Sequence, residues 1–140
     1  MAARTFNVTI NGYRRDEDKN GLPKVSGVYF VYVAKYNTKE DNVTLISLLY
    51  IGESDDINNR IANHERYNDW KKKVNSGDEL VFSYSSIPGD DRFRVEAAYI
   101  FERKPPLNVE YKNNFPFDQT KITSSGKTAL LTIDFTVNRT

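Results

Sequence analysis

Two short apolar runs and the polar segment between them are the feature that most constrains the fold of this chain. Residues 28–33 and 45–51 are rich in β-branched and aromatic side chains, and Gly27 and Gly52 lie at their ends. This composition is typical of β-strands. The intervening residues 35–42 are too many for a tight turn and too polar for a core. The pattern predicts a two-stranded hairpin whose connecting loop projects from the protein.

A change of periodicity after Gly52 predicts a helix. The serine and two aspartates at residues 54–56 are good N-cap residues, and the helix is expected to begin near Ile57. Arg60 and His64 are four residues apart, which places them on one face of such a helix. A guanidinium and an imidazole are therefore expected side by side, next to the tyrosines of the hairpin.

A second helix is predicted over residues 92–103, because its apolar side chains recur at helical spacing. The predicted apolar stripe consists of Phe93, Ala97, Ile100 and Phe101. Glu96 lies at the edge of this stripe, and a carboxylate near a core is costly unless a cation meets it. Two interpretations stay open. Glu96 either pairs with Arg92 four residues earlier, for about 0.2–0.5 kcal/mol, or it binds a divalent metal ion.

Five short motifs follow one another along the chain in a fixed order. They are Gly27-Val28-Tyr29, Tyr50-Ile51-Gly52, Arg60 with His64, Glu96, and Lys104-Pro105-Pro106-Leu107-Asn108. In this order, and over residues 22–108, the sequence resembles the GIY-YIG nuclease domain. A single tripeptide of this kind arises by chance, whereas the ordered set is specific.

The resemblance implies an α/β fold with a small, mainly antiparallel central sheet flanked by helices. Residues 1–140 would form a single domain, in which the core at 22–108 is extended by an N-terminal strand region at 1–21 and a C-terminal region at 109–140. The implied function is that of a metal-dependent DNA endonuclease, which hydrolyses phosphodiester bonds. Glu96 would bind one Mg²⁺ or Mn²⁺ ion per site, with water filling most of the other positions.

The resemblance also assigns roles to the remaining site residues. Tyr50 would be the general base or would orient the attacking water, and Tyr29 would position water or phosphate beside it. A phenol has a pKa of about 10, so a tyrosine base needs a nearby cation or metal ion to favour its phenolate. Arg60 and the metal ion would supply that charge, and Arg60 would also bind the phosphate, while His64 would hydrogen-bond a tyrosine or take its proton. Asn108 would help to order the site.

Composition narrows the class of protein further. The 140 residues are 39% hydrophobic and 28% charged, which is ordinary for a soluble domain. No run approaches the roughly 18 apolar residues of a membrane span, and the N-terminus lacks the apolar segment of a signal peptide. We therefore expect an intracellular, cytoplasmic protein with no membrane partner. The absence of cysteine and the single histidine exclude thiolate catalysis and multi-histidine zinc sites.

The net charge of +1 is small for a protein that binds DNA through its overall charge, so local basic patches would have to bind the DNA. The candidate DNA contacts are Arg66, Lys71, Lys72 and Lys104, with Arg92, Arg94 and Arg103 as further candidates. Each of these cations can instead be part of an ordinary solvated face. Glu53 follows the second glycine, where many relatives carry a basic or small residue. Its charge either lowers DNA affinity or points into solvent.

The rest of the chain gives weaker signals. We predict a strand at 6–10, a mobile surface loop at 11–21, a short helix from 67 to about 77, a strand at 79–87, a turn at 124–126 and a last strand at 129–137. Trp70 would lie in the core or in a lid. The last strand would pair with the N-terminal strand or with a second copy of the chain.

Three functions compete on the sequence alone. The first is the endonuclease, in restriction, repair, homing or phage-type DNA degradation; a restriction enzyme would need a homodimer to cut both strands. The second is a catalytically weak or inactive module of the same fold that binds nucleic acid or another partner. The third is a scaffold with an accidental motif, in which the polar residues would scatter rather than converge on one cleft. The choice between DNA and RNA as substrate also stays open.

Overall fold

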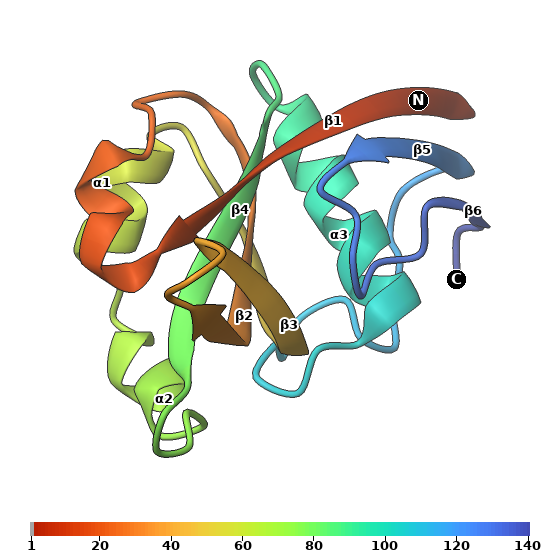
Figure 1. Cartoon of the computed structure of the whole chain (residues 1–140). Coiled ribbons are helices and arrows are strands. Elements are labelled where there is room, and N and C mark those ends of the chain that lie inside the picture. The colour runs from red at the N-terminus through yellow and green to blue at the C-terminus, as the bar shows by residue number, and fades with distance from the viewer. Residues whose placement is uncertain (1) are drawn as a thin grey trace.

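The computed structural model describes residues 2–140. These residues form a six-stranded sheet with helices on both faces (Figure 1). The strands are β1 (Arg4–Arg15), β2 (Gly27–Asn37), β3 (Asn42–Ser54), β4 (Glu79–Ser86), β5 (Thr120–Gly126) and β6 (Asp134–Val137). The helices are the 3-10 helix η1 (Asp16–Gly21) and α1 (Ile57–Ala62), α2 (Tyr67–Lys71) and α3 (Asp91–Arg103). Strand order is β3-β2-β4-β1-β5-β6, and only the β1–β5 pair is parallel. The fold is thus α/β with a mixed sheet.

Strand β2, which lies between β3 and β4, divides the core in two, because its side chains alternate between the faces of the sheet. Tyr29 and Val31 pack with α1 and α2 on one face, where Trp70 is fully buried. Phe30 and Tyr32 pack with α3 on the other face. Figure 1 shows α1 and α2 on one side of the sheet and α3 on the opposite side. Of the two positions predicted for Trp70, the structure shows the core.

Regular pairing between β2 and β3 puts both motif tyrosines on the same face, and a β-bulge in β3 adds Leu49 to that face. Tyr50 lies opposite Val31, but Leu48 lies opposite Tyr32, so Leu49 is an extra residue in β3. Bulges of this kind occur near functional sites, where they redirect a side chain. Leu49 and Tyr50 consequently both face α1 and α2, the side on which Tyr29 lies.

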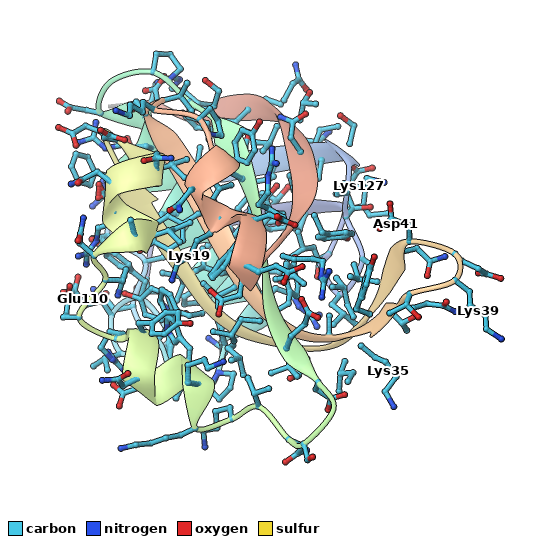
Figure 2. The ribbon with its side chains drawn as sticks, turned by 60° about the vertical axis from the view of Figure 1, so that its left-hand side comes forward. Lys19, Lys35, Lys39, Asp41, Glu110 and Lys127 are labelled. Carbon is cyan, nitrogen blue, oxygen red and sulfur yellow. The ribbon has the colours of Figure 1, made fainter. Side chains whose placement is uncertain are left out.

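Residues 11–21 are not the mobile loop that was predicted. Strand β1 continues to Arg15, and η1 follows it directly. The reason is pairing with a distant strand: β1 binds β4, and the Arg15 guanidinium donates two hydrogen bonds of 2.8 Å to Glu79. The projecting loop is likewise shorter than predicted, because β2 and β3 continue through it and leave only residues 38–41. Figure 2 shows Lys39 and Asp41 at the tip of this hairpin, which does project from the protein.

The C-terminal region was also predicted incorrectly. Residues 124–126 belong to strand β5 rather than to a turn, and the last strand covers only β6. It is β5, not the last strand, that pairs with β1, and β6 pairs with β5. Arg94 stabilises this edge: buried at 4% exposure, it donates to Thr120 Oγ1 at 2.7 Å and to the carbonyls of Ala2 and Gln119 at 2.9 Å. The guanidinium of this candidate DNA contact is therefore occupied within the protein.

The helices differ from prediction at their ends. α1 ends at Ala62, so His64 lies outside it, and α2 ends at Lys71 rather than near residue 77. α3 matches its predicted span, but Phe93 is not on the buried stripe, because 38% of it is exposed. Within residues 2–140, no helix combines the length and apolar character that crossing a membrane requires.

Candidate active site

Both motif glycines are required by close packing. Tyr29 lies opposite Gly52, and its ring covers that residue so closely that a Cβ at position 52 would be 2.3 Å from the Tyr29 hydroxyl oxygen. At Gly27, a Cβ would lie 1.9 Å from the carbonyl oxygen of Ser85 on the neighbouring strand. Contacts below 3.0 Å are not tolerated. A side chain at position 52 would therefore displace the hydroxyl, and one at position 27 would push β2 and β4 away from each other.

His64 reaches Tyr29 from the turn that follows α1. Its Nε2 atom lies 2.7 Å from the Tyr29 hydroxyl oxygen, and its Nδ1 accepts the backbone N–H of Arg66 at 3.0 Å. A neutral imidazole carries one N–H, so an accepting Nδ1 leaves the proton on Nε2. His64 therefore donates to Tyr29, whose own proton is free for another acceptor.

The protonation state of His64 supports this arrangement. Burial lowers its pKa to about 4, and the nearby positive charge of Arg60 adds to the effect. The imidazole is consequently neutral at pH 7, with Nε2 already protonated. Of the two roles predicted for His64, the hydrogen bond to a tyrosine is present, whereas accepting the proton of Tyr29 is excluded by this geometry.

The two motif tyrosines are phenols in this environment. Burial raises the pKa of Tyr29, the neighbouring Tyr50 raises it further, and the charge of Arg60 opposes this only incompletely. Burial also raises the pKa of Tyr50, with Glu96 contributing in the same direction. Arg60 does favour the phenolate of both tyrosines, as predicted, but in the protein without a metal ion its charge is outweighed by burial. The tyrosines are suited to orienting a ligand through their hydroxyl groups.

Arg60 is held by Glu65, a partner that was not predicted. Its guanidinium binds the Glu65 carboxylate through two hydrogen bonds of 2.6 and 2.9 Å. The Glu65 side chain is 66% exposed. Because exposed ion pairs are worth about 0–1 kcal/mol, a phosphate can replace Glu65 on the same donors. The signal in the sequence was the carboxylate directly after His64.

Glutamates converge on a hollow beside Tyr50, which we call the Glu96 hollow. Its volume is about 340 Å³, and it is lined by Tyr50 and Glu53 of β3, Phe93 and Glu96 of α3, Arg66 and residues 108–111. Burial, with smaller contributions from the charges of Glu53 and Glu110, raises the pKa of Glu96 to about 8. Figure 2 shows Glu110 at the periphery of the protein. Glu110 lies outside the five motifs and was not among the predicted site residues.

Glu96 has no cationic partner in the described residues of the chain. Arg92 pairs with Glu53 instead, at 3.0 Å, so the ion pair considered for Glu96 is not formed. No other Lys, Arg or His of residues 2–140 lies within 4.0 Å of the Glu96 carboxylate. Glu53 is thus neither unpaired nor directed into solvent, since its side chain is only 19% exposed.

Asn108 is a positioning residue. Its side-chain oxygen accepts the Ile51 N–H at 2.9 Å, and its amide nitrogen donates to the Ile51 carbonyl at 2.8 Å. The backbone N–H of Leu107 donates to the Leu49 carbonyl at 3.1 Å. Residues 107 and 108 therefore bind the free edge of β3 on both sides of Tyr50, which fixes the strand that carries this tyrosine.

The predicted DNA contacts are mostly engaged within the protein. Arg66 lines the Glu96 hollow but binds Asp69 at 2.9 Å and the Leu107 carbonyl at 3.0 Å. Lys71 lies 3.9 Å from Asp16, and Lys104 donates to the Lys112 carbonyl. Lys72 is exposed. These cations do not form a continuous basic surface around the hollow.

The predicted site residues nevertheless come together. The Tyr29 and Tyr50 rings are 6.4 Å apart, and their centroids lie 5.9 and 5.4 Å from that of the His64 ring. The charges of Arg60 and Glu96 both act on the two tyrosines, and Asn108 lies in the Glu96 hollow with Tyr50. Scattering, which an accidental motif would produce, is not observed.

Comparison of the chain with protein-family models, with curated proteins and with solved structures gives no match.

Proposed function

We propose that this protein is a metal-dependent endonuclease of the GIY-YIG type that hydrolyses phosphodiester bonds in DNA. The observation that carries the proposal is the convergence of the motif residues. Side chains from β2, β3, the turn after α1, and α3 surround one region on the edge of the sheet. Their chemistry matches the needs of phosphodiester hydrolysis: hydroxyl groups to orient water, a guanidinium for phosphate charge, and a carboxylate for a metal ion.

Glu96 fits the role of the metal-binding residue. It is a largely buried carboxylate without a cation in residues 2–140, and its raised pKa reflects how unfavourable its bare charge is there. No group of three or more potential ligands is present in that range, but Mg²⁺ is commonly held by one or two carboxylates plus water and substrate phosphate. When bound, such an ion stabilises negative charge on the phosphate and on the leaving oxygen.

The protein's own residues would act as follows. Arg60 exchanges the Glu65 carboxylate for a phosphate oxygen, using the same two donors. Tyr29, which accepts the His64 Nε2–H, donates its own hydroxyl proton to a phosphate oxygen or to water. Tyr50 orients the attacking water through its hydroxyl oxygen, and Asn108 keeps the strand in place. Of the two roles considered for Tyr50, its raised pKa favours orientation over proton removal.

Nicking of supercoiled plasmid, with and without Mg²⁺ or Mn²⁺, tests the proposal. Metal-dependent nicking is expected for the wild type, and Arg60→Ala should lower the rate by about a hundredfold to a thousandfold, as for loss of a transition-state donor. Arg139→Ala is the matched control, because Arg139 also binds a carboxylate, that of Asp118 at 2.8 Å. Folded wild type that cleaves neither plasmid nor RNA in any metal would favour the inactive binding module instead.

The Glu65 ion pair gives a prediction of opposite sign. Glu65→Gln removes the competitor for Arg60, so DNA affinity should rise by up to about fivefold, the limit set by 1 kcal/mol for an exposed pair. Fluorescence anisotropy with labelled DNA in Ca²⁺ would measure it. Glu17→Gln is the control, because Glu17 binds Arg15 at the same 2.6 Å and is 65% exposed. An equal rise in both variants would show a general charge effect and not competition for Arg60.

A further inference from the structure

Two exposed apolar side chains border the Glu96 hollow. Residues 2–140 contain five large hydrophobic residues that are exposed: Ile46, Phe93, Val109, Leu130 and Ile133. Phe93, at 38% exposure, and Val109, at 79%, both line this hollow with Tyr50 and Glu96. Scattered apolar residues on a surface are normal, but two that meet at a candidate active site form a contact surface.

Both apolar residues are held by anchored neighbours. The guanidinium of Arg92 lies 4.6 Å from the centre of the Phe93 ring, and it is fixed by Glu53 at 3.0 Å and by the Gly89 carbonyl at 2.8 Å. Val109 directly follows Asn108, which is buried and bound to Ile51. The Phe93 ring and the backbone next to Val109 are therefore held in place, so little conformational freedom is lost there on contact with a ligand.

The charges around the hollow argue against binding through phosphates alone. Glu53, Glu96 and Glu110 surround it, and its cation Arg66 is engaged with Asp69. Affinity for continuous duplex DNA comes mainly from contacts between phosphates and free cations, which are few here. An exposed aromatic ring instead favours a base, because every base can stack on it. In a duplex these base faces are covered by their neighbours.

We propose that Phe93 and Val109 receive an unstacked base next to the scissile phosphate, so that the substrate is DNA with unpaired nucleotides, such as a single strand, a flap or a gap. This inference rests on the proposed nuclease function and names its substrate class. The hollow, at about 340 Å³, lies at the lower end of the range for small-ligand sites, which is large enough for a single base. Glu53 then has a role of its own, because it anchors the Arg92 side chain on which Phe93 rests.

Binding without cleavage tests the inference directly. Labelled single-stranded, gapped and continuous duplex oligonucleotides would be titrated with protein in Ca²⁺, with anisotropy as readout. Wild type should prefer the first two, Phe93→Ala should lose roughly 5- to 150-fold in affinity for them, and Phe93→Tyr should retain it. Leu130→Ala is the matched control, since Leu130 has the same exposed fraction of 38%. Equal affinity for all three DNAs, or an unchanged Phe93→Ala variant, would overturn the proposal.

Cleavage of the same oligonucleotides in Mg²⁺ or Mn²⁺ separates the two proposals. Faster cleavage of gapped DNA that is lost in Phe93→Ala supports both. Cleavage of continuous duplex at the same rate, unaffected by Phe93→Ala, overturns the base-binding inference and leaves the nuclease standing. Binding that depends on Phe93 without cleavage in any metal overturns the nuclease and supports a base-binding surface. If none of the DNAs binds, the inference is overturned, and a protein partner becomes the expected ligand of Phe93 and Val109.

Discussion

Glu96→Gln is expected to abolish DNA cleavage while making the folded protein more stable at alkaline pH. Mutation of a residue that only hydrogen-bonds a metal ligand typically lowers metal affinity or activity by about 10- to 100-fold. Loss of the ligand itself should therefore lower the cleavage rate by about a hundredfold or more. The amide has nearly the same shape as the carboxylate and carries no charge. The fold is therefore expected to persist, and the loss of activity can be assigned to the missing charge.

The direction of the pH effect follows from the pKa of Glu96. It is about 8 in the folded protein against 4.5 as the reference value, so the folded state holds this proton more tightly than the unfolded state does. The stability of the wild type consequently falls as pH rises from 4.5 to 8, and above 8 the full cost is present. Glu96→Gln lacks this cost, and its free energy of unfolding should exceed that of the wild type by about 2 kcal/mol or more at about pH 9.

Denaturant unfolding of both proteins at about pH 5 and about pH 9, on either side of this titration, with and without Mn²⁺, would measure these effects. Mn²⁺ should stabilise the wild type, because it binds the folded carboxylate, and it should leave Glu96→Gln unchanged. At limiting metal concentration, cleavage by the wild type should increase with pH, because the metal binds only the ionised Glu96 and competes with its proton. Glu102→Gln, a substitution of an exposed glutamate on the same helix, is the control. Equal stability of wild type and Glu96→Gln at the alkaline pH would contradict the assigned environment.

The elements predicted best are those whose signal is local. The hairpin and α3 are visible as apolar periodicity, and Pro105 ends the helix because it cannot continue it. Strand β5 was missed because its inward positions include Thr120 and Ser124, which carry no hydrophobic signal. Those hydroxyl groups are satisfied by residues of α3, Arg94 and Tyr99. A polar strand that owes its burial to partners on another element has no signature in its own sequence.

The candidate site shows the same division. Residue identities and their order along the chain were enough to name Tyr29, Tyr50 and Glu96, which the structure brings close together. The ion pairs were not predictable, because they depend on where the chain turns. Ending α1 at Ala62 lets Glu65 fold back to Arg60, and Arg92 reaches Glu53 across the gap between α3 and β3. The raised pKa values have the same origin, since they depend on burial by distant segments.

Alanine at the two motif glycines should separate a requirement of the fold from a requirement of the site. A methyl group at position 27 meets backbone, the Ser85 carbonyl at 1.9 Å, and β2 and β4 cannot both stay in place. Gly27→Ala should therefore lower the free energy of unfolding by about 3 kcal/mol or more, the upper range for an overpacked core. Thermal unfolding followed by circular dichroism would measure it.

At position 52 the obstacle is the end of a side chain. The Tyr29 hydroxyl would have to leave the position in which His64 binds it, at a cost of about 1–3 kcal/mol for overpacking and the lost bond. Gly52→Ala should stay folded at room temperature and lose cleavage, as Tyr29→Phe should, because both remove the hydroxyl from the site. Gly77→Ala is not a suitable control, because Gly77 has a φ of 89° and an alanine would be strained there. Ala62→Gly is the control instead. A different outcome would contradict this geometry: Gly52→Ala would cleave DNA at the wild-type rate while Tyr29→Phe would not. The Tyr29 hydroxyl would then be needed for cleavage, but not in the position over Gly52 that is inferred here.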